Sequence, residues 1–178
     1  EWRGPIVCSG ETILAFTQGG DALAALSAKD GSVIWKQPIG DVLLKAPQKS
    51  GAQWLLAGKN NRILLLNSGD GKIDAEILWP TWLVDVLAIT LDGKPLVVCS
   101  DIRGRLSVLD AATLKTLREI RLPAPPCSDM LFVPQFPGTW GSTSTTGADA
   151  DVESILALDT PKTKLQPAIL VTDRDGFC

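Results

Sequence analysis

The chain has 178 residues, 45% hydrophobic and 21% charged, so it is long enough to bury a core and has the composition of a globular protein. A formal net charge of −3, with the two signs interspersed, disfavours nucleic-acid binding, and no apolar run approaches the ~18 residues of a membrane-spanning helix. The absence of histidine excludes Ser-His-Asp and Cys-His catalysis and every metal site built on imidazole.

The first unit of the chain contains four short β-prone runs, at Pro5 to Ser9, Thr12 to Thr17, Ala22 to Ser27 and Ser32 to Lys36. Turn residues separate them, and an Asp-Gly turn ending at Gly31 joins the last two. Four strands joined by hairpins in about forty residues are the content of one β-propeller blade.

The second unit repeats this plan. We expect strands at Val42 to Ala46, Gln53 to Ala57, Arg62 to Asn67 and Ile73 to Leu78, with the last turn ending at Gly71. Aligning the pairs Leu26-Ser27, Leu66-Asn67 and Leu109-Asp110 gives intervals of 40 and 43 residues. A supersecondary unit repeated at this period is typical of solenoids and propellers.

The third unit has predicted strands at Leu83 to Thr90, Pro95 to Ser100, Leu106 to Asp110 and Leu117 to Leu122. Gly104 lies in the turn between the middle two, and Asp110 opens the last turn. Residues 109–122 also fit a helical period, but a strand pair explains both these residues and the repeat.

The end of the chain is less regular. Leu158-Asp159 is the next match to the repeat, and a polar insertion at 137–151 lengthens that interval. One interpretation makes Leu165 to Val171 the fourth strand of the fourth blade unit. The other places it in a further blade that begins within residues 168–178, because residues 168–177 resemble residues 96–105. The blade units are therefore expected at about 5–40, 41–80, 82–123 and 124–171.

The repeat also resembles a known family. Ala25-Leu-Ser-Ala-Lys-Asp-Gly-Ser-Val-Ile-Trp35 is similar to the repeat of the PQQ-like (quinoprotein alcohol dehydrogenase-like) β-propellers, roughly Ala-Leu-Asp-Ala-x-Thr-Gly-x-x-x-Trp. Val108-Leu-Asp-Ala-Ala-Thr-Leu114 keeps part of this motif with Leu114 in place of Gly. Leu65-Leu-Asn-Ser-Gly-Asp-Gly71 keeps the turn and loses the Trp. The WD40 family is less similar, because its Gly-His and Trp-Asp dipeptides are absent.

The resemblance implies an all-β chain with about four blades of four antiparallel strands, belonging to a ring that in this family usually has seven or eight. It also implies structural roles for Gly31, Gly71, Gly104 and Asp110 in the blades. Trp35 would pack between neighbouring blades, with its indole N–H bonded to a backbone carbonyl.

Cofactor chemistry is not expected. The family's dehydrogenases carry adjacent cysteines over the quinone, whereas the four cysteines here, at 8, 99, 127 and 178, are far apart in the sequence. They are either small buried hydrophobes or partners in a disulfide whose pairing is open. The turns at Asp92 and at 173–176 resemble parts of calcium loops but offer too few acidic ligands. We therefore expect neither PQQ nor calcium.

Taken together, the sequence predicts a non-enzymatic β-propeller scaffold that mediates protein–protein interaction as part of a larger protein or assembly. Partners would be proteins, among them a second propeller segment that completes the ring. Candidate interaction residues are Trp82 and Trp140, and Trp140 either anchors a partner or folds back onto the propeller. The alternatives are a small-ligand or sensor propeller and an accessory domain of a larger enzyme.

Overall fold

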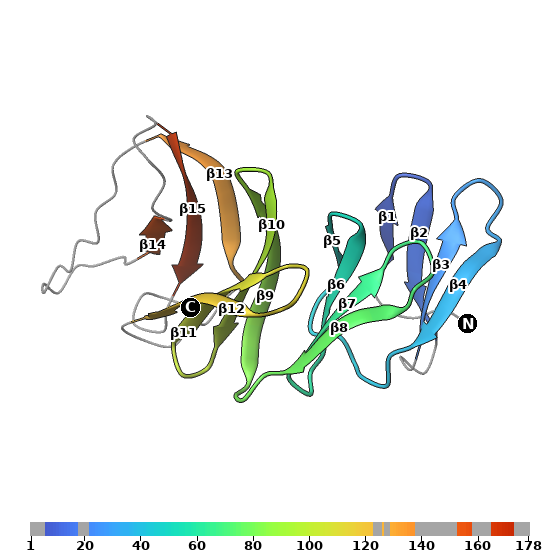
Figure 1. Cartoon of the computed structure of the whole chain (residues 1–178), viewed down its shortest axis with the longest axis horizontal. Coiled ribbons are helices and arrows are strands. Elements are labelled where there is room, and N and C mark those ends of the chain that lie inside the picture. The colour runs from blue at the N-terminus through green and yellow to red at the C-terminus, as the bar shows by residue number, and fades with distance from the viewer. Residues whose placement is uncertain are drawn as a thin grey trace, which may run out of the picture. The chain divides into compact units, whose positions relative to one another are not determined.

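The computed structural model describes residues 6–17, 22–122, 126, 129–137, 153–157 and 165–172, with side chains described as far as Met130. These residues form strands and no helix, so the all-β prediction is confirmed (Figure 1). None of them belongs to a helix long and apolar enough to cross a membrane. The chain divides into two compact units, one of Glu1–Trp82 with Asp110–Lys115 and one of Leu83–Leu109 with Thr116–Cys178.

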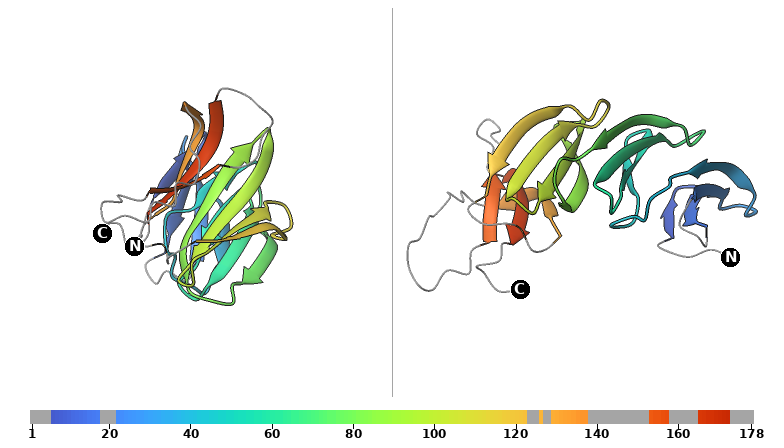
Figure 2. Two further views of the ribbon diagram at one scale, coloured as in Figure 1. Left: turned by 90° about the vertical axis from the view of Figure 1, so that its left-hand side faces the viewer. Right: turned by 90° about the horizontal axis from the view of Figure 1, so that it is seen from below.

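Unit one contains two four-stranded antiparallel sheets, each with its strands in chain order (Figure 2). Blade one consists of β1 (Val7–Ser9), β2 (Thr12–Phe16), β3 (Ala22–Ser27) and β4 (Val33–Pro38). Blade two consists of β5 (Gln48–Ser50), β6 (Gln53–Ala57), β7 (Arg62–Asn67) and β8 (Ile73–Leu78). In each blade the pairing of the last two strands shifts register close to the turn that joins them. The shift lies between Ala25 and Leu26 in blade one and between Leu65 and Leu66 in blade two.

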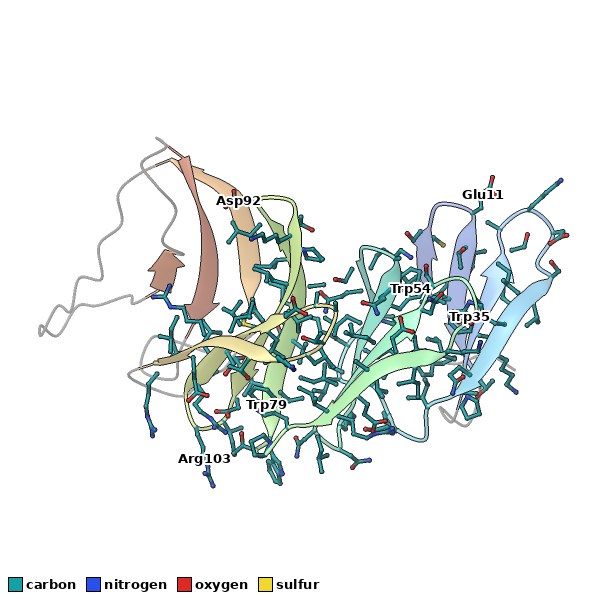
Figure 3. All side chains as sticks on the ribbon, viewed as in Figure 1. Glu11, Trp35, Trp54, Trp79, Asp92 and Arg103 are labelled. Carbon is teal, nitrogen blue, oxygen red and sulfur yellow. The ribbon has the colours of Figure 1, made fainter. Side chains whose placement is uncertain are left out.

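The core of unit one lies between these two sheets. Trp35 and Trp54 occupy it (Figure 3) and are 7% and 1% exposed. The cluster joins side chains of both blades: Leu14, Phe16, Leu23, Ala25, Trp35, Ile39, Trp54, Leu56, Leu64 and Leu66. Because a single sheet cannot bury its own apolar face, the two blades stabilise each other through this cluster.

The first strand of blade two is not where the sequence placed it. Residues 42–46 form only an isolated bridge, Leu43 to Gly58, and the strand begins at Gln48. The Val42 carbonyl accepts a hydrogen bond from Lys59 N at 2.8 Å, so this segment follows the β6–β7 turn. The hairpin to β6 turns instead at Gly51, whose φ of 58° suits glycine.

Unit two contains a four-stranded sheet, blade three, in the order β12-β11-β10-β9. Its strands are β9 (Leu83–Leu91), β10 (Lys94–Asp101), β11 (Arg105–Asp110) and β12 (Thr116–Arg121). Residues 109–122 therefore form the predicted strand pair and not a helix. The buried cluster of this unit contains Ile89, Val98, Leu106, Val108, Leu122 and Met130.

A second sheet of unit two has three strands, β13 (Leu131–Pro137), β14 (Glu153–Ala157) and β15 (Leu165–Thr172). Its order is β13-β15-β14, so β15 is a central strand paired on both edges. The buried carboxylate of Asp85 accepts a hydrogen bond from Met130 N at 2.7 Å and so holds the segment entering β13 against β9. Most of the polar insertion at 137–151, including Trp140, lies outside the described residues.

Replacing Trp35 by Ala should lower the free energy of unfolding by about 3–5 kcal/mol, since the indole is buried between two sheets. Trp82→Ala is the matched control, because Trp82 is 69% exposed and its loss should cost less than about 1 kcal/mol. Urea midpoints of the two variants compare them directly. Equal losses would contradict the core assignment.

Candidate functional site

Three turns with the same backbone geometry join the last two strands of the three blades. In each, the N–H of the fifth residue donates to the carbonyl of the first, at 2.8–2.9 Å: Gly31 to Ser27, Gly71 to Asn67 and Leu114 to Asp110. The fifth residue has a positive φ, 73° at both glycines and 55° at Leu114. The repeat found in the sequence is therefore a repeat of this turn.

Side chains inside each turn accept hydrogen bonds at two positions. At the first position an oxygen accepts from the backbone N–H two residues later: Lys29 to Ser27 at 3.2 Å, Gly69 to Asn67 at 2.9 Å, and Ala112 to Asp110 at 3.1 Å. At the fourth position the same bond recurs: Ser32 to Asp30 and Lys72 to Asp70, both at 3.1 Å, and Lys115 to Thr113 at 3.4 Å. These oxygens hold the turn, as short polar side chains do in Asx and Ser/Thr turns.

The carboxylates of these turns are stabilised in their charged form. The Thr113 hydroxyl, which donates to Asp110 at 2.7 Å, lowers the pKa of Asp110 below its ordinary value. The Ser32 hydroxyl does the same for the pKa of Asp30. The Lys72 N–H and ammonium lower the pKa of Asp70. The common cause is hydrogen bonding to the ionised form.

Asp110→Asn should make stability less dependent on pH in acid. A depressed folded-state pKa contributes stability above the unfolded-state pKa of about 3.9, and this contribution is lost as pH falls through the folded-state value. Asn keeps an acceptor, as Asn67 does in blade two, so the substitution isolates the charge. Urea midpoints between about pH 2 and 6 should differ most at the upper end and converge in acid. Parallel profiles would contradict this role.

Trp35 joins blade one to the turn of blade two. Its Nε1–H donates to the Ser68 carbonyl at 3.0 Å, and its six-membered ring lies against Gly71. A Cβ on Gly71 would overlap this ring. Glycine is thus required at position 71 for two reasons, the positive φ and the close approach of the indole.

Gly71→Ala should destabilise the protein far more than Gly31→Ala. Both glycines have a φ of 73°, but no described atom lies within 4 Å of a Cβ on Gly31. Gly31→Ala should therefore cost only the backbone penalty of about 1–2 kcal/mol, and Gly71→Ala about 1–3 kcal/mol more. In a Trp35→Ala background the two costs should become equal, as a double-mutant cycle by urea denaturation would measure. A difference that persists there would mean that the indole is not the cause.

The opposite end of the unit-one strands carries a network of polar contacts. We call residues 39–47, 58–61 and 79–82 the linker end; Figure 3 labels Trp79 there and Glu11 at the other end of the strands. The buried carboxylate of Asp41 accepts hydrogen bonds from Asn60 N at 3.2 Å and Asn60 Nδ2 at 3.0 Å. Arg62 Nη1 donates to the Ile39 carbonyl at 2.7 Å, and Trp79 N donates to the Asn61 carbonyl at 2.7 Å. These bonds fix both linkers to the β6–β7 turn.

Large apolar side chains are exposed on this fixed framework. Val42, Leu78 and Trp82 are 55%, 73% and 69% exposed. Val42 belongs to the linker bonded to Lys59, and Leu78 and Trp82 flank the linker bonded to Asn61. Of the two candidate interaction residues, Trp82 is therefore exposed at the linker end, and Trp140 lies outside the described residues. The sequence offered no signal for Asp41, because its partner is 19 residues away.

The remaining predicted residues lie in turns or strands. Gly104 has a φ of 73° in the β10–β11 turn, where its N–H donates to the Asp101 carbonyl at 3.0 Å. Cys8 is exposed and Cys99 is buried, and both are free thiols. Burial raises the pKa of the Cys99 thiol, as do the nearby Asp85 and Asp101 carboxylates. Cys127 and Cys178 lie outside the described residues.

The repeated turns and four-stranded sheets define the blades of a PQQ-like β-propeller. Residues 1–132 match the family described as outer membrane protein assembly factor BamB, and the chain belongs to this family. No curated protein matches the chain.

Solved structures share the fold at low identity. BamB from Moraxella catarrhalis has a TM-score of 0.53 and 21% identity, over 63% of this chain and 34% of that one. The computationally designed Ika4 protein has a TM-score of 0.57 and 12% identity, over 71% and 76%. A europium-containing methanol dehydrogenase has a TM-score of 0.54 and 14% identity, over 68% and 25%. The chain thus spans about a third of the length of the Moraxella BamB.

Proposed function

We propose that the chain is a non-catalytic propeller scaffold whose linker end binds a protein partner. The observation that carries this proposal is the exposure of Val42 and Trp82 on linkers that hydrogen bonds hold in place, and of Leu78 at the end of β8 next to one of them. Exposed large apolar side chains on a fixed framework are a feature of interaction sites, and Trp is enriched among the residues that dominate binding energy.

The family supports the same class of function. Its description names a factor in the assembly of outer membrane proteins. We propose that this chain likewise acts within a larger protein or assembly.

The proposal includes no quinone or calcium chemistry for this chain. Among the described residues there is no group of three or more Cys, Asp or Glu side chains placed to hold a metal ion. Asp30, Asp70 and Asp110 are engaged inside their own turns. Of the cysteines that the structure describes, Cys8 is exposed and Cys99 is buried, and they do not form the adjacent pair found in the quinone enzymes.

Partner binding should depend on the linker end and not on apolar exposure in general. A photo-crosslinking residue at position 82 should capture a discrete partner in cells, whereas one at position 117 should not. Leu117 is the matched control, since it is 60% exposed on the outer strand of blade three.

The doubly substituted variant Leu78→Ser with Trp82→Ser should melt within a few degrees of the parent, because both side chains are exposed. Its affinity for the captured partner should fall at least about 30-fold, the size of a hot-spot loss of ~2 kcal/mol. Unchanged affinity would contradict the proposal.

A further inference from the structure

Asp-Gly pairs occur in the sequence at 30–31, 70–71, 92–93 and 175–176, and the last of these lies outside the described residues. In such a pair the glycine N can attack the side-chain carbonyl carbon of the aspartate, because glycine has no Cβ to hinder the ring closure. An N–C bond forms, one water leaves, and a cyclic imide results. Water then reopens the ring at either carbonyl and gives aspartate or isoaspartate. The fold decides which pair can react, because both reacting groups must be free to meet.

The pairs in the repeated turns of blades one and two are held at both reacting groups. The glycine N–H already donates to a backbone carbonyl, from Gly31 at 2.8 Å and from Gly71 at 2.9 Å. The carboxylates of Asp30 and Asp70 each accept a bond from the backbone N–H two residues later, at 3.1 Å. Hydrogen bonds lower the pKa of both carboxyl groups and so favour the charged form, which resists attack by nitrogen.

The pair Asp92-Gly93 differs at each of these points. It forms the two-residue turn between β9 and β10, closed by the register pair Leu91 and Lys94, and Figure 3 labels Asp92 at the tip of this hairpin. Both residues are exposed. Within the described part of the chain, no group donates a hydrogen bond to the Asp92 carboxylate, and the Gly93 N–H donates to no backbone carbonyl. Asp92 also has a φ of 49°, a conformation that costs a non-glycine residue energy, so rotation out of it releases strain.

We propose that Asp92-Gly93 is a site of spontaneous modification, at which the chain converts aspartate into isoaspartate. In the product the backbone runs through Cβ and Cγ of residue 92 and is longer by one methylene. The length of a hairpin turn sets the register of its strands, so the longer turn loosens the pairing of β9 and β10 next to it. The modified turn is then a substrate for enzymes that methylate isoaspartyl carboxylates.

Heavy-oxygen water provides the test. The full chain is kept folded at neutral pH in this water, and each reopening of an imide ring adds one heavy oxygen at the residue that formed it. Mass spectrometry of proteolytic peptides then measures the label separately at residues 30, 70 and 92. Residue 92 should take up label at least about tenfold faster than residues 30 and 70, the factor that corresponds to one hydrogen bond to a charged group.

The unfolded chain is the matched control. In guanidinium chloride the turns are lost and each aspartate is simply followed by glycine, so the three sites should take up label at similar rates. Asp92→Glu should remove the label at position 92 alone, because the longer side chain closes a less favourable ring. The proposal is overturned if residue 92 is as slow as residues 30 and 70 in the folded chain, or if folding slows none of the three.

Discussion

The contact between the Trp35 indole and the Ser68–Gly71 turn is the constraint on which unit one depends. This side chain packs between two sheets, satisfies its own N–H on a backbone carbonyl and closes over a glycine that has no room for a Cβ. Repeated units that contact only their neighbours depend on the packing between them, so this junction stabilises both blades. The turn geometry is therefore a condition for packing as well as for reversing the chain.

The turns show why the family motif tolerates change. The first position of the turn must supply an acceptor oxygen within reach of the backbone N–H two residues later, and Ser27, Asn67 and Asp110 all supply one. The fifth position is less tolerant, because a positive φ costs a non-glycine residue on the order of 1–2 kcal/mol. Leu114 adopts it nonetheless and is 3% exposed, so burial of its side chain offsets the backbone cost.

The repeated turns could be predicted from the sequence because their signals are local. A polar residue, a glycine and alternating apolar residues lie within about ten positions, and the structure has strands and turns at nearly all of these places. The predicted position of the first strand of blade two was wrong because the Val42 carbonyl is hydrogen-bonded to Lys59 N, and no local sequence pattern indicates this contact. The same holds for Asp41 with Asn60 and for the order of β13, β14 and β15, all of which depend on residues distant in the chain.

Five aspartates of the described part are used within the fold. Asp30, Asp70 and Asp110 accept bonds from their own turns, Asp41 holds a linker, and Asp85 anchors the segment before β13. A carboxylate committed in this way would have to break these bonds before binding a ligand. In the proposed function, what the chain offers to a partner is apolar surface at the linker end. Recognition through such surfaces depends on shape and burial, which suits binding by protein partners.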